Sequence, residues 1–182
     1  MDEQDRQRVM VLDAARGTIA EGRPLSFNDL ARDAGVGVGT VYRHFGSIEA
    51  LRAAVVADSL DELLEVGRRA LTMPEAAEGL AAFLTSALTA QLRDDAMTQV
   101  IEAETDTDPR TSSAKAELGS IFASLLESAT ARGALRSGIS AGDVAAMLCG
   151  ISHTARLHPR EDAAAAADQF LTILLAGLAP PR

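Results

Sequence analysis

The feature that most constrains the fold is residues 27–45, FNDLARDAGVGVGTVYRHF, where two short helical patterns flank a glycine-rich turn. Leu30, Ala31 and Ala34 have the spacings of three and four residues that place side chains on one buried helix face. Gly35 follows them at the position where the end of a helix favours a left-handed residue. The stretch therefore predicts a helix, a tight turn and a second short helix.

The second helix of this pair carries polar side chains on its expected outer face. Thr40, Tyr42, Arg43 and His44 supply a hydroxyl, a phenol, a guanidinium and an imidazole, which are groups that bind phosphate oxygens and base edges. Taken alone, Tyr42 and His44 are better explained by packing within a small bundle. Their spacing within a helix-turn-helix favours contact with DNA, and the stretch is therefore predicted to read DNA.

Helical periodicity continues along the rest of the chain, and no stretch of useful length alternates with a period of two residues. We expect helices at approximately residues 5–21, 27–33, a third ending at 45, then 47–70, 74–92, 97–104, 109–133, 140–157 and 161–178. Ser26 and Asp29 resemble a capping box for the second of these helices. We predict an all-α protein of about nine helices, with an N-terminal three-helix helix-turn-helix domain at residues 1–50 and a C-terminal helical bundle at residues 51–182.

The acidic charge of the chain argues against nucleic-acid binding, because affinity for the DNA backbone depends on Lys and Arg. The formal charge is −9, but residues 1–58 carry seven Arg and nine Asp plus Glu, which leaves −2 for the segment containing the reader. The other −7 belongs to residues 59–182. Contacts with the DNA phosphates would have to come from helix N-termini and from the placement of five arginines, Arg6, Arg8, Arg32, Arg43 and Arg52.

The composition also limits the compartment and the chemistry. No run approaches the roughly 20 apolar residues of a membrane span, and the charged start MDEQDRQRVM contains no apolar signal-peptide segment, so we expect a soluble cytoplasmic protein with no membrane partner.

The single cysteine, Cys149, excludes an intramolecular disulfide. His153 and His158 are five residues apart, which does not place them on one helix face as metal ligands. No motif of a catalytic nucleophile or a phosphate-binding loop is present, so we expect no enzymatic activity, no cofactor and no metal site.

The first 55 residues or so resemble the TetR family of transcriptional regulators. The resemblance rests on a helix ending around residues 13–15, on the turn at Gly22, and on a larger group of residues within and just after the helix-turn-helix of residues 27–45. That set comprises Leu30, Ala31, Ala34, Gly35, Val36, Gly39, Thr40, Val41, Tyr42, His44, Phe45, Glu49 and Leu51. The resemblance implies a homodimer whose recognition helices enter successive major grooves of a palindromic operator in double-stranded DNA. It also implies that residues 51–182 form a divergent ligand-binding and dimerisation domain, where an unknown small-molecule effector releases repression.

Carried over position by position, the resemblance implies DNA contacts from two helices and the turn between them. The implied contact residues are Ser26, Asn28, Gly37, Val38, Gly39, Thr40, Tyr42, Arg43 and His44. Ser26 would cap the second helix toward a phosphate, and Asn28 would read an adenine edge. Val38 would touch a thymine methyl group, while Tyr42 and His44 would hydrogen-bond phosphates.

Two positions depart from the family pattern. Gly37 stands where the family often has serine, so a side-chain cap is lost, and Ile48 stands where it commonly has lysine, so one phosphate contact is missing. Arg43, the one strong cation on the helix, would compensate. Together with the acidic charge, Ile48 leaves an alternative open: a sensor or interaction protein of the same fold that does not bind DNA.

The effector pocket is expected between helices of the C-terminal bundle and to be aliphatic, because the chain has no Trp and its only Tyr lies in the reader. The candidate lining residues, each of which taken alone is better explained as plain core, are Leu64, Phe83, Leu84, Leu88, Met97, Ile101, Phe122, Leu125 and Met147. The last two helices have apolar arcs too wide for one intramolecular neighbour, which predicts a four-helix dimer interface. Its expected residues are Val144, Met147, Leu148, Ile151, Phe170, Ile173 and Leu174.

Overall fold

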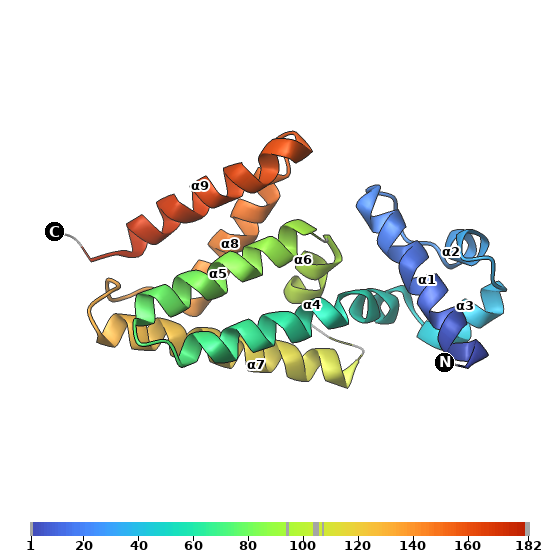
Figure 1. The fold of residues 1–182 in the computed structure, drawn as a ribbon, viewed down its shortest axis with the longest axis horizontal. Helices are drawn as coiled ribbons and strands as arrows, with labels where there is room; N and C mark the ends of the chain where they lie inside the picture. Colours follow the sequence, from blue (N-terminus) through green and yellow to red (C-terminus); the bar gives the residue numbers. More distant parts are fainter. Residues whose placement is uncertain (1, 94, 104–105, 107, 181–182) are drawn as a thin grey trace. The chain divides into compact units, whose positions relative to one another are not determined.

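The computed structural model describes residues 2–93, 95–103, 106 and 108–180, excepting the side chains of residues 95, 160 and 161. Within these residues the regular structure is entirely α-helical, which confirms the predicted fold class and helix number. The helices are α1 (Glu3–Ala20), α2 (Phe27–Asp33), α3 (Val38–Phe45), α4 (Ile48–Leu71), α5 (Ala76–Arg93), α6 (Asp95–Glu102), α7 (Pro109–Ala131), α8 (Ala141–Ala155) and α9 (Arg160–Leu178) (Figure 1). None of the described helices is long and apolar enough to cross a membrane.

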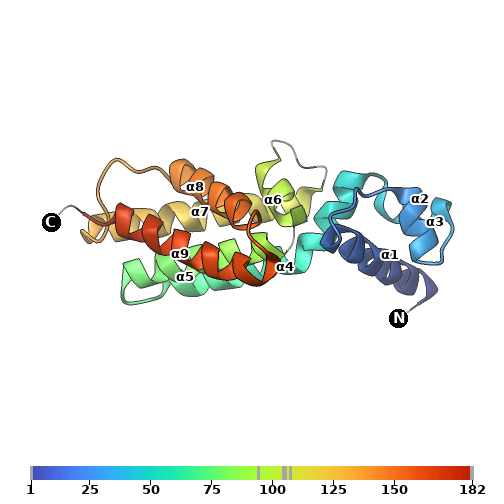
Figure 2. The ribbon, with the colours of Figure 1, turned by 90° about the horizontal axis from the view of Figure 1, so that it is seen from above.

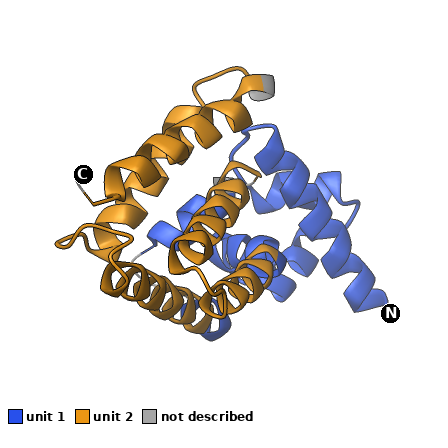
Figure 3. Cartoon of the chain, turned by 60° about the vertical axis from the view of Figure 1, so that its left-hand side comes forward, with its two compact units in different colours: residues 1–58, 94–112 blue, residues 59–93, 113–182 orange. Residues whose placement is uncertain are grey.

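The chain divides into two compact units, which are coloured separately in Figure 3. Unit 1 comprises residues 1–58 and 94–112, and unit 2 comprises residues 59–93 and 113–182. Helix α4 therefore contributes its first part to unit 1 and the remainder to unit 2. The expected division of function at residue 50 stays a prediction.

Unit 1 is organised around α1, which packs against α2, α3 and α6. Its core takes apolar side chains from each of the first four helices, and α1, α2 and α3 lie together in both views (Figures 1 and 2). Val11 and Ala15 of α1, Leu30 of α2, Val41 of α3 and Leu51 of α4 are each 0% exposed. Because these residues recur at helical spacing, they fix which face of each helix is left for solvent.

The turn between α2 and α3 has the geometry that its glycine predicts. Gly35 adopts a left-handed conformation with φ of +67°, and the backbone N–H of Val36 donates to the carbonyl of Ala31 at 2.9 Å. This six-to-one hydrogen bond closes α2 in a Schellman motif. The predicted helix over residues 27–33, the turn and the helix ending at Phe45 are therefore confirmed.

The predicted capping box at the start of α2 is wrong. Ser26 does occupy the N-cap position, but its side chain makes no capping hydrogen bond. The carboxylate of Asp29 accepts instead from the guanidinium of Arg32, with Oδ1 2.7 Å from Nη2. A charge-assisted bond to a neighbouring Arg holds this carboxylate away from the backbone N–H of Ser26. By contrast, the Ser47 hydroxyl caps α4, accepting from the backbone N–H of Ala50 at 3.1 Å.

In unit 2, α5 packs against both α8 and α9, and α8 packs against α9. The predicted start of α8 is confirmed, because Ser140 and Asp143 form a reciprocal capping box. Hydrogen bonds from Ser140 hold the pKa of the Asp143 carboxyl below its usual value. The helix ends at Ala155 rather than near 157, and Leu157 is left 74% exposed beyond it.

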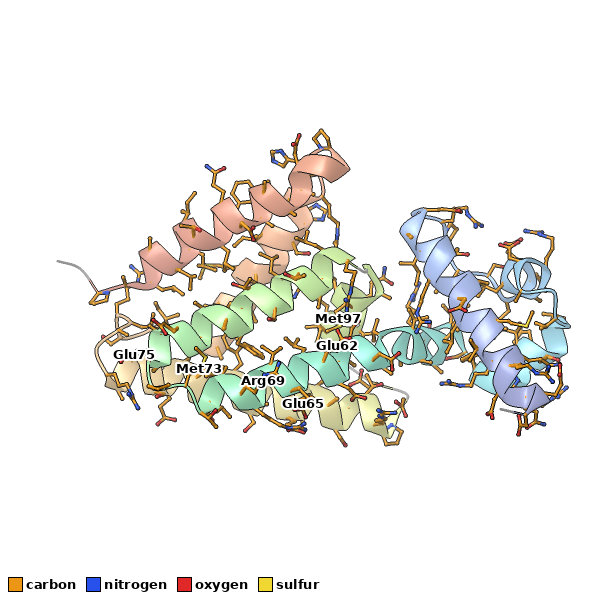
Figure 4. All side chains as sticks on the ribbon, viewed as in Figure 1. Glu62, Glu65, Arg69, Met73, Glu75 and Met97 are labelled. Carbon is orange, nitrogen blue, oxygen red and sulfur yellow. The ribbon has the colours of Figure 1, made fainter. Side chains whose placement is uncertain are left out.

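Two glycines of unit 2 sit where neighbouring atoms leave no room for a side chain. A Cβ atom added to Gly79 of α5 would lie 2.6 Å from the backbone oxygen of Ala70 in α4. Met73, labelled in Figure 4, lies in the turn that joins these two helices. A Cβ atom on Gly67 would lie 2.8 Å from the Ile121 side chain of α7. These glycines set the close approach of α4 to its neighbours in unit 2.

Candidate nucleic-acid interface

Helix α3 is anchored by one face and exposed on the other. Val41 and Phe45, four residues apart, are 0% and 7% exposed and hold the inner face in the core of unit 1. Between them, Tyr42 is 58% exposed and Arg43 is also exposed, while Val38 at the start of the helix is 39% exposed. The helix therefore presents a phenol, a guanidinium and an apolar side chain outward from a fixed base.

The Tyr42 ring is both packed and exposed. Its edge meets the ring of Phe27 in α2, with the ring centroids 4.6 Å apart and the planes at 85°. This edge-to-face contact restricts the ring while more than half of the side chain stays open to solvent. Packing and DNA contact are therefore compatible roles for Tyr42, since the ring supports α3 and the hydroxyl remains available.

His44 is placed differently from its neighbours. It is half-buried, and its Nε2 atom is enclosed and has no hydrogen-bond partner among the described residues. Its ring centroid lies 6.1 Å from that of Phe45. A phosphate contact through Nε2 would require the imidazole ring to rotate out of this position. Of the predicted DNA-contact residues on α3, His44 is therefore the one that the geometry supports least.

The other predicted contact residues lie on α2 and at the start of α3. Asn28 is exposed in the first turn of α2, whereas Ser26 and Thr40 are half-buried. Gly37 is the N-cap of α3 and offers no side-chain cap, and a Cβ atom placed on Gly39 would meet nothing within 4 Å. The glycines are thus not required by packing within the chain, and they leave the backbone at the N-terminus of α3 accessible.

The structure separates the arginines of unit 1 into paired and unpaired groups. Four of the seven Arg in residues 1–58 form ion pairs with carboxylates of the same unit. Arg6 pairs with Glu3 at 2.6 Å, for example, and Arg32 with Asp29 at 2.7 Å. Both pairs are three residues apart on one helix, a spacing that could have identified them from the sequence. Because their charges are already partly neutralised, these arginines would bind DNA phosphates less strongly than unpaired arginines would.

Arg8, Arg43 and Arg52 have no carboxylate within ion-pair distance among the described residues. The Arg8 guanidinium stacks instead over the Phe45 ring, 5.7 Å from its centroid, which draws a cation of α1 onto α3. No pattern in the sequence identifies this contact, because residues 8 and 45 meet only after α1 packs against α3. The arginines of residues 1–58 without an ion pair therefore lie on α1, on α3 and near the start of α4.

The residues predicted for the dimer interface fall into two groups. Val144 and Leu148 are 0% and 4% exposed, because they face the interior of unit 2. The others line a shallow apolar groove along α8 and α9, with Ile173 63% exposed. The groove is lined by Met147, Gly150, Ile151, Thr154, Phe170, Ile173 and Leu174.

The residues predicted for an effector pocket belong to both units. Six are buried in unit 2, with the rings of Phe83 and Phe122 5.7 Å apart: Leu64, Phe83, Leu84, Leu88, Phe122 and Leu125. Met97 and Ile101 belong to α6 in unit 1, and Met147 lies in the α8–α9 groove, where it is 42% exposed. Among the described residues, no cluster of three or more His, Cys, Asp or Glu could hold a metal ion.

Two family profiles match the chain. A profile described as bacterial regulatory proteins of the tetR family matches residues 11–55, which contain the helix-turn-helix. A second, described as the C-terminal domain of SbtR-like transcriptional regulators, matches residues 74–180, more than half of the chain. No curated protein matches the sequence.

Solved structures of regulators share the fold. The TetR transcriptional regulator SCO0520 from Streptomyces coelicolor is 29% identical, with a TM-score of 0.61, and the match covers 96% of this chain and 99% of that one. A TetR regulatory protein from Mycobacterium vanbaalenii is 25% identical, with a TM-score of 0.55 and 98% of each chain covered. The ketosteroid transcriptional regulator KstR2 of Mycobacterium tuberculosis is 21% identical and has a TM-score of 0.70, with 96% and 95% covered.

Proposed function

Because this chain belongs to the TetR family of transcriptional regulators, we propose that it represses transcription as a homodimer bound to a palindromic operator. The observation that carries the proposal is the outer face of α3, where Tyr42 and Arg43 project from a helix held by Val41 and Phe45. A side-chain row of this kind suits a major groove. In the cytoplasm, two such helices in one dimer would enter successive grooves about 34 Å apart.

Within each half-site the contacts divide by chemistry. The Tyr42 hydroxyl binds a phosphate, and Arg43 binds a phosphate or a guanine edge. Asn28 reads an adenine edge, and Val38 meets a thymine methyl group. Gly37, Gly39 and Thr40 let the backbone approach the DNA closely, while Ser26 and His44 are secondary contacts. Because the phosphate footprint is small, affinity depends strongly on joining two half-sites in one dimer.

The proposed dimer forms through the α8–α9 groove. Its exposed apolar side chains would meet the same groove of a second copy around a two-fold axis, as the commonest closed symmetry requires. Val144 and Leu148 would support this surface from behind, since they are buried within their own unit. Ile173, the most exposed of the groove's large apolar side chains, would lie within the interface.

We propose that a largely apolar effector bound in unit 2 releases the operator. The aliphatic character of the buried cluster around Phe83 and Phe122 supports this ligand class. Among proteins of the same fold, the regulator FadR from Bacillus subtilis was solved with stearoyl-CoA. The expected function is regulation rather than catalysis.

The test is selection of bound duplexes from a random pool at several salt concentrations. We expect an enriched palindrome, with an affinity that falls as salt rises because phosphate binding releases counterions. The second candidate, a sensor or interaction protein of the same fold, is favoured by the −2 charge of residues 1–58 and by the four paired arginines. Failure to enrich any sequence would support this second function.

Replacing Arg43 with Ala is expected to weaken operator binding roughly tenfold or more and to reduce the salt slope by about one. The physical reason is the loss of a cation that no carboxylate neutralises. The matched control is Arg32→Ala, because Arg32 is exposed but already pairs with Asp29 and Asp33. Titration of a labelled operator at several salt concentrations measures both quantities. Equal effects of the two substitutions would show that ion pairing does not distinguish these arginines.

Replacing Asn28 with Ala is expected to change the base preference at one position in each half-site. A bidentate amide contact to adenine contributes about 1–3 kcal/mol of discrimination, and alanine cannot replace it. Asn28 is exposed, so the folded state should be unaffected. Repeating the selection with the variant measures the preference directly. A uniformly weaker but unchanged pattern would move Asn28 from the base-reading group to the phosphate-binding group.

A further inference from the structure

The seam between α5 and α8 in unit 2 contains polar groups in an environment that normally excludes them. Gln91 of α5 is 5% exposed and Ser152 of α8 is 0% exposed. The Gln91 Oε1 and Ser152 Oγ atoms are both buried, and neither has a hydrogen-bond partner among the described residues. A buried polar atom left without a partner destabilises a protein, and such atoms are rare in native structures. Two of them on neighbouring helices call for a functional explanation.

The contacts of α8 place these groups on one seam. Helix α5 packs against α8, and a guanidinium N–H of Arg156 donates to the backbone carbonyl of Gln91. Ser152 lies four residues before Arg156 and therefore on the same face of α8. In an α-helix a long side chain leans toward the N-terminus, so the Gln91 amide leans back along α5. The two helices run in the same general direction (Figures 1 and 2). Since Arg156 reaches the Gln91 carbonyl and Ser152 lies one turn before Arg156, we infer that the Gln91 amide leans toward Ser152.

Apart from the Arg156 guanidinium, the nearest buried side chains on the same faces of the two helices are apolar. Leu88 lies three residues before Gln91 and is 2% exposed, and Leu148 lies four residues before Ser152 and is 4% exposed. In a low-dielectric environment a hydrogen bond supplied to either polar atom would be strong. Such a seam therefore discriminates sharply between a ligand that completes the hydrogen bonds and one that does not.

We propose that Gln91 and Ser152 form the polar end of the effector site and bind a neutral hydroxyl or carboxamide on an otherwise apolar molecule. This inference rests on the proposed ligand response and specifies its chemistry. The Gln91 Oε1 atom can only accept, so the ligand must donate a hydrogen, and the Ser152 hydroxyl can donate back to the same group. A carboxylate has no hydrogen to donate, so it would leave the Gln91 Oε1 atom without a partner. In the free protein the two buried polar atoms lack hydrogen-bond partners, which costs free energy. A ligand that supplies those hydrogen bonds removes this cost, and its binding is therefore favoured.

The first test needs no ligand. Ser152→Ala is compared with Ser124→Ala, where an exposed serine of α7 reports the gain in helix propensity alone. We expect the melting temperature of Ser152→Ala to exceed that of the control by about 2–4 °C, because the substitution removes a buried hydroxyl without a partner. A rise no larger than the control's would mean that an ordered water satisfies the hydroxyl, and it would overturn the proposal. Gln91→Met, similar in volume, is expected to act in the same direction.

The second test uses three probes of matched length on the full-length protein: 1-octanol, octyl methyl ether and octanoate. We expect 1-octanol to raise the melting temperature relative to the ether in the wild type, because only the alcohol can donate to the Gln91 Oε1 atom, and we expect this difference to disappear in Gln91→Met. Stabilisation by octanoate alone would overturn the neutral class, and equal effects of alcohol and ether would overturn the site. Both tests are independent of DNA, so they can fail while operator selection succeeds, or succeed while it fails.

Discussion

Replacing Ile173 with Glu is expected to convert the dimer into monomers and to lower operator affinity by roughly a thousandfold or more. In a two-fold interface the substitution occurs on both copies, so two carboxylates enter one apolar contact without cationic partners. A monomer contacts a single half-site, and its affinity falls toward that of non-specific binding. Ile173 is 63% exposed within its own chain, so the fold of the monomer should be preserved.

Molar mass from light scattering and titration of the selected operator measure the two effects of Ile173→Glu. The matched control is Leu71→Glu, which introduces the same charge at an apolar side chain of α4 that is 45% exposed and is not among the residues lining the groove. The control is expected to remain dimeric and to bind the operator. An Ile173→Glu protein that stays dimeric would reject the α8–α9 groove as the interface.

Replacing Gly79 with Ala is expected to lower the free energy of unfolding by about 1–3 kcal/mol, although alanine favours a helix more than glycine does. The added Cβ atom would lie 2.6 Å from the Ala70 oxygen, which belongs to the backbone of α4 and cannot rotate away. Either α4 and α5 must separate or the end of α4 must distort. The neighbours of Gly67 are side chains, which have more freedom to move.

Thermal or urea unfolding of Gly79→Ala measures this loss, with Gly119→Ala as the control. Gly119 lies within α7, and a Cβ atom added there would meet nothing within 4 Å. The control is therefore expected to gain up to about 1 kcal/mol from helix propensity. If both variants became more stable, the close approach of α4 and α5 would have to be adjustable at little cost.

The helices and the helix-turn-helix were predictable because their signals are local. Gly35 marked the turn correctly, since only its own backbone conformation and a hydrogen bond between nearby residues are involved. The capping box at Ser26 failed for an equally local reason, because Arg32 competes for the Asp29 carboxylate. A competing partner three residues away was visible in the sequence, but its geometry was not.

The roles of individual apolar residues in the last two helices were less predictable. Val144 and Ile173 belong to the same predicted interface, yet the first is 0% and the second 63% exposed. Helical periodicity identifies a wide apolar arc but does not say which part of the arc meets a neighbour in the same chain. That choice depends on how α5 packs against α8 and α9.

The helical class, the family and the outer face of α3 were predictable from the sequence, because each depends on residue identities and spacings within short segments of the chain. Only the tertiary structure decided that Arg8 stacks over Phe45, that Gln91 and Ser152 are buried on neighbouring helices, and that Gly79 lies against the backbone of Ala70. These relations join residues that are far apart in the chain. They arise from side-chain packing between helices, which the periodicity of one segment does not specify.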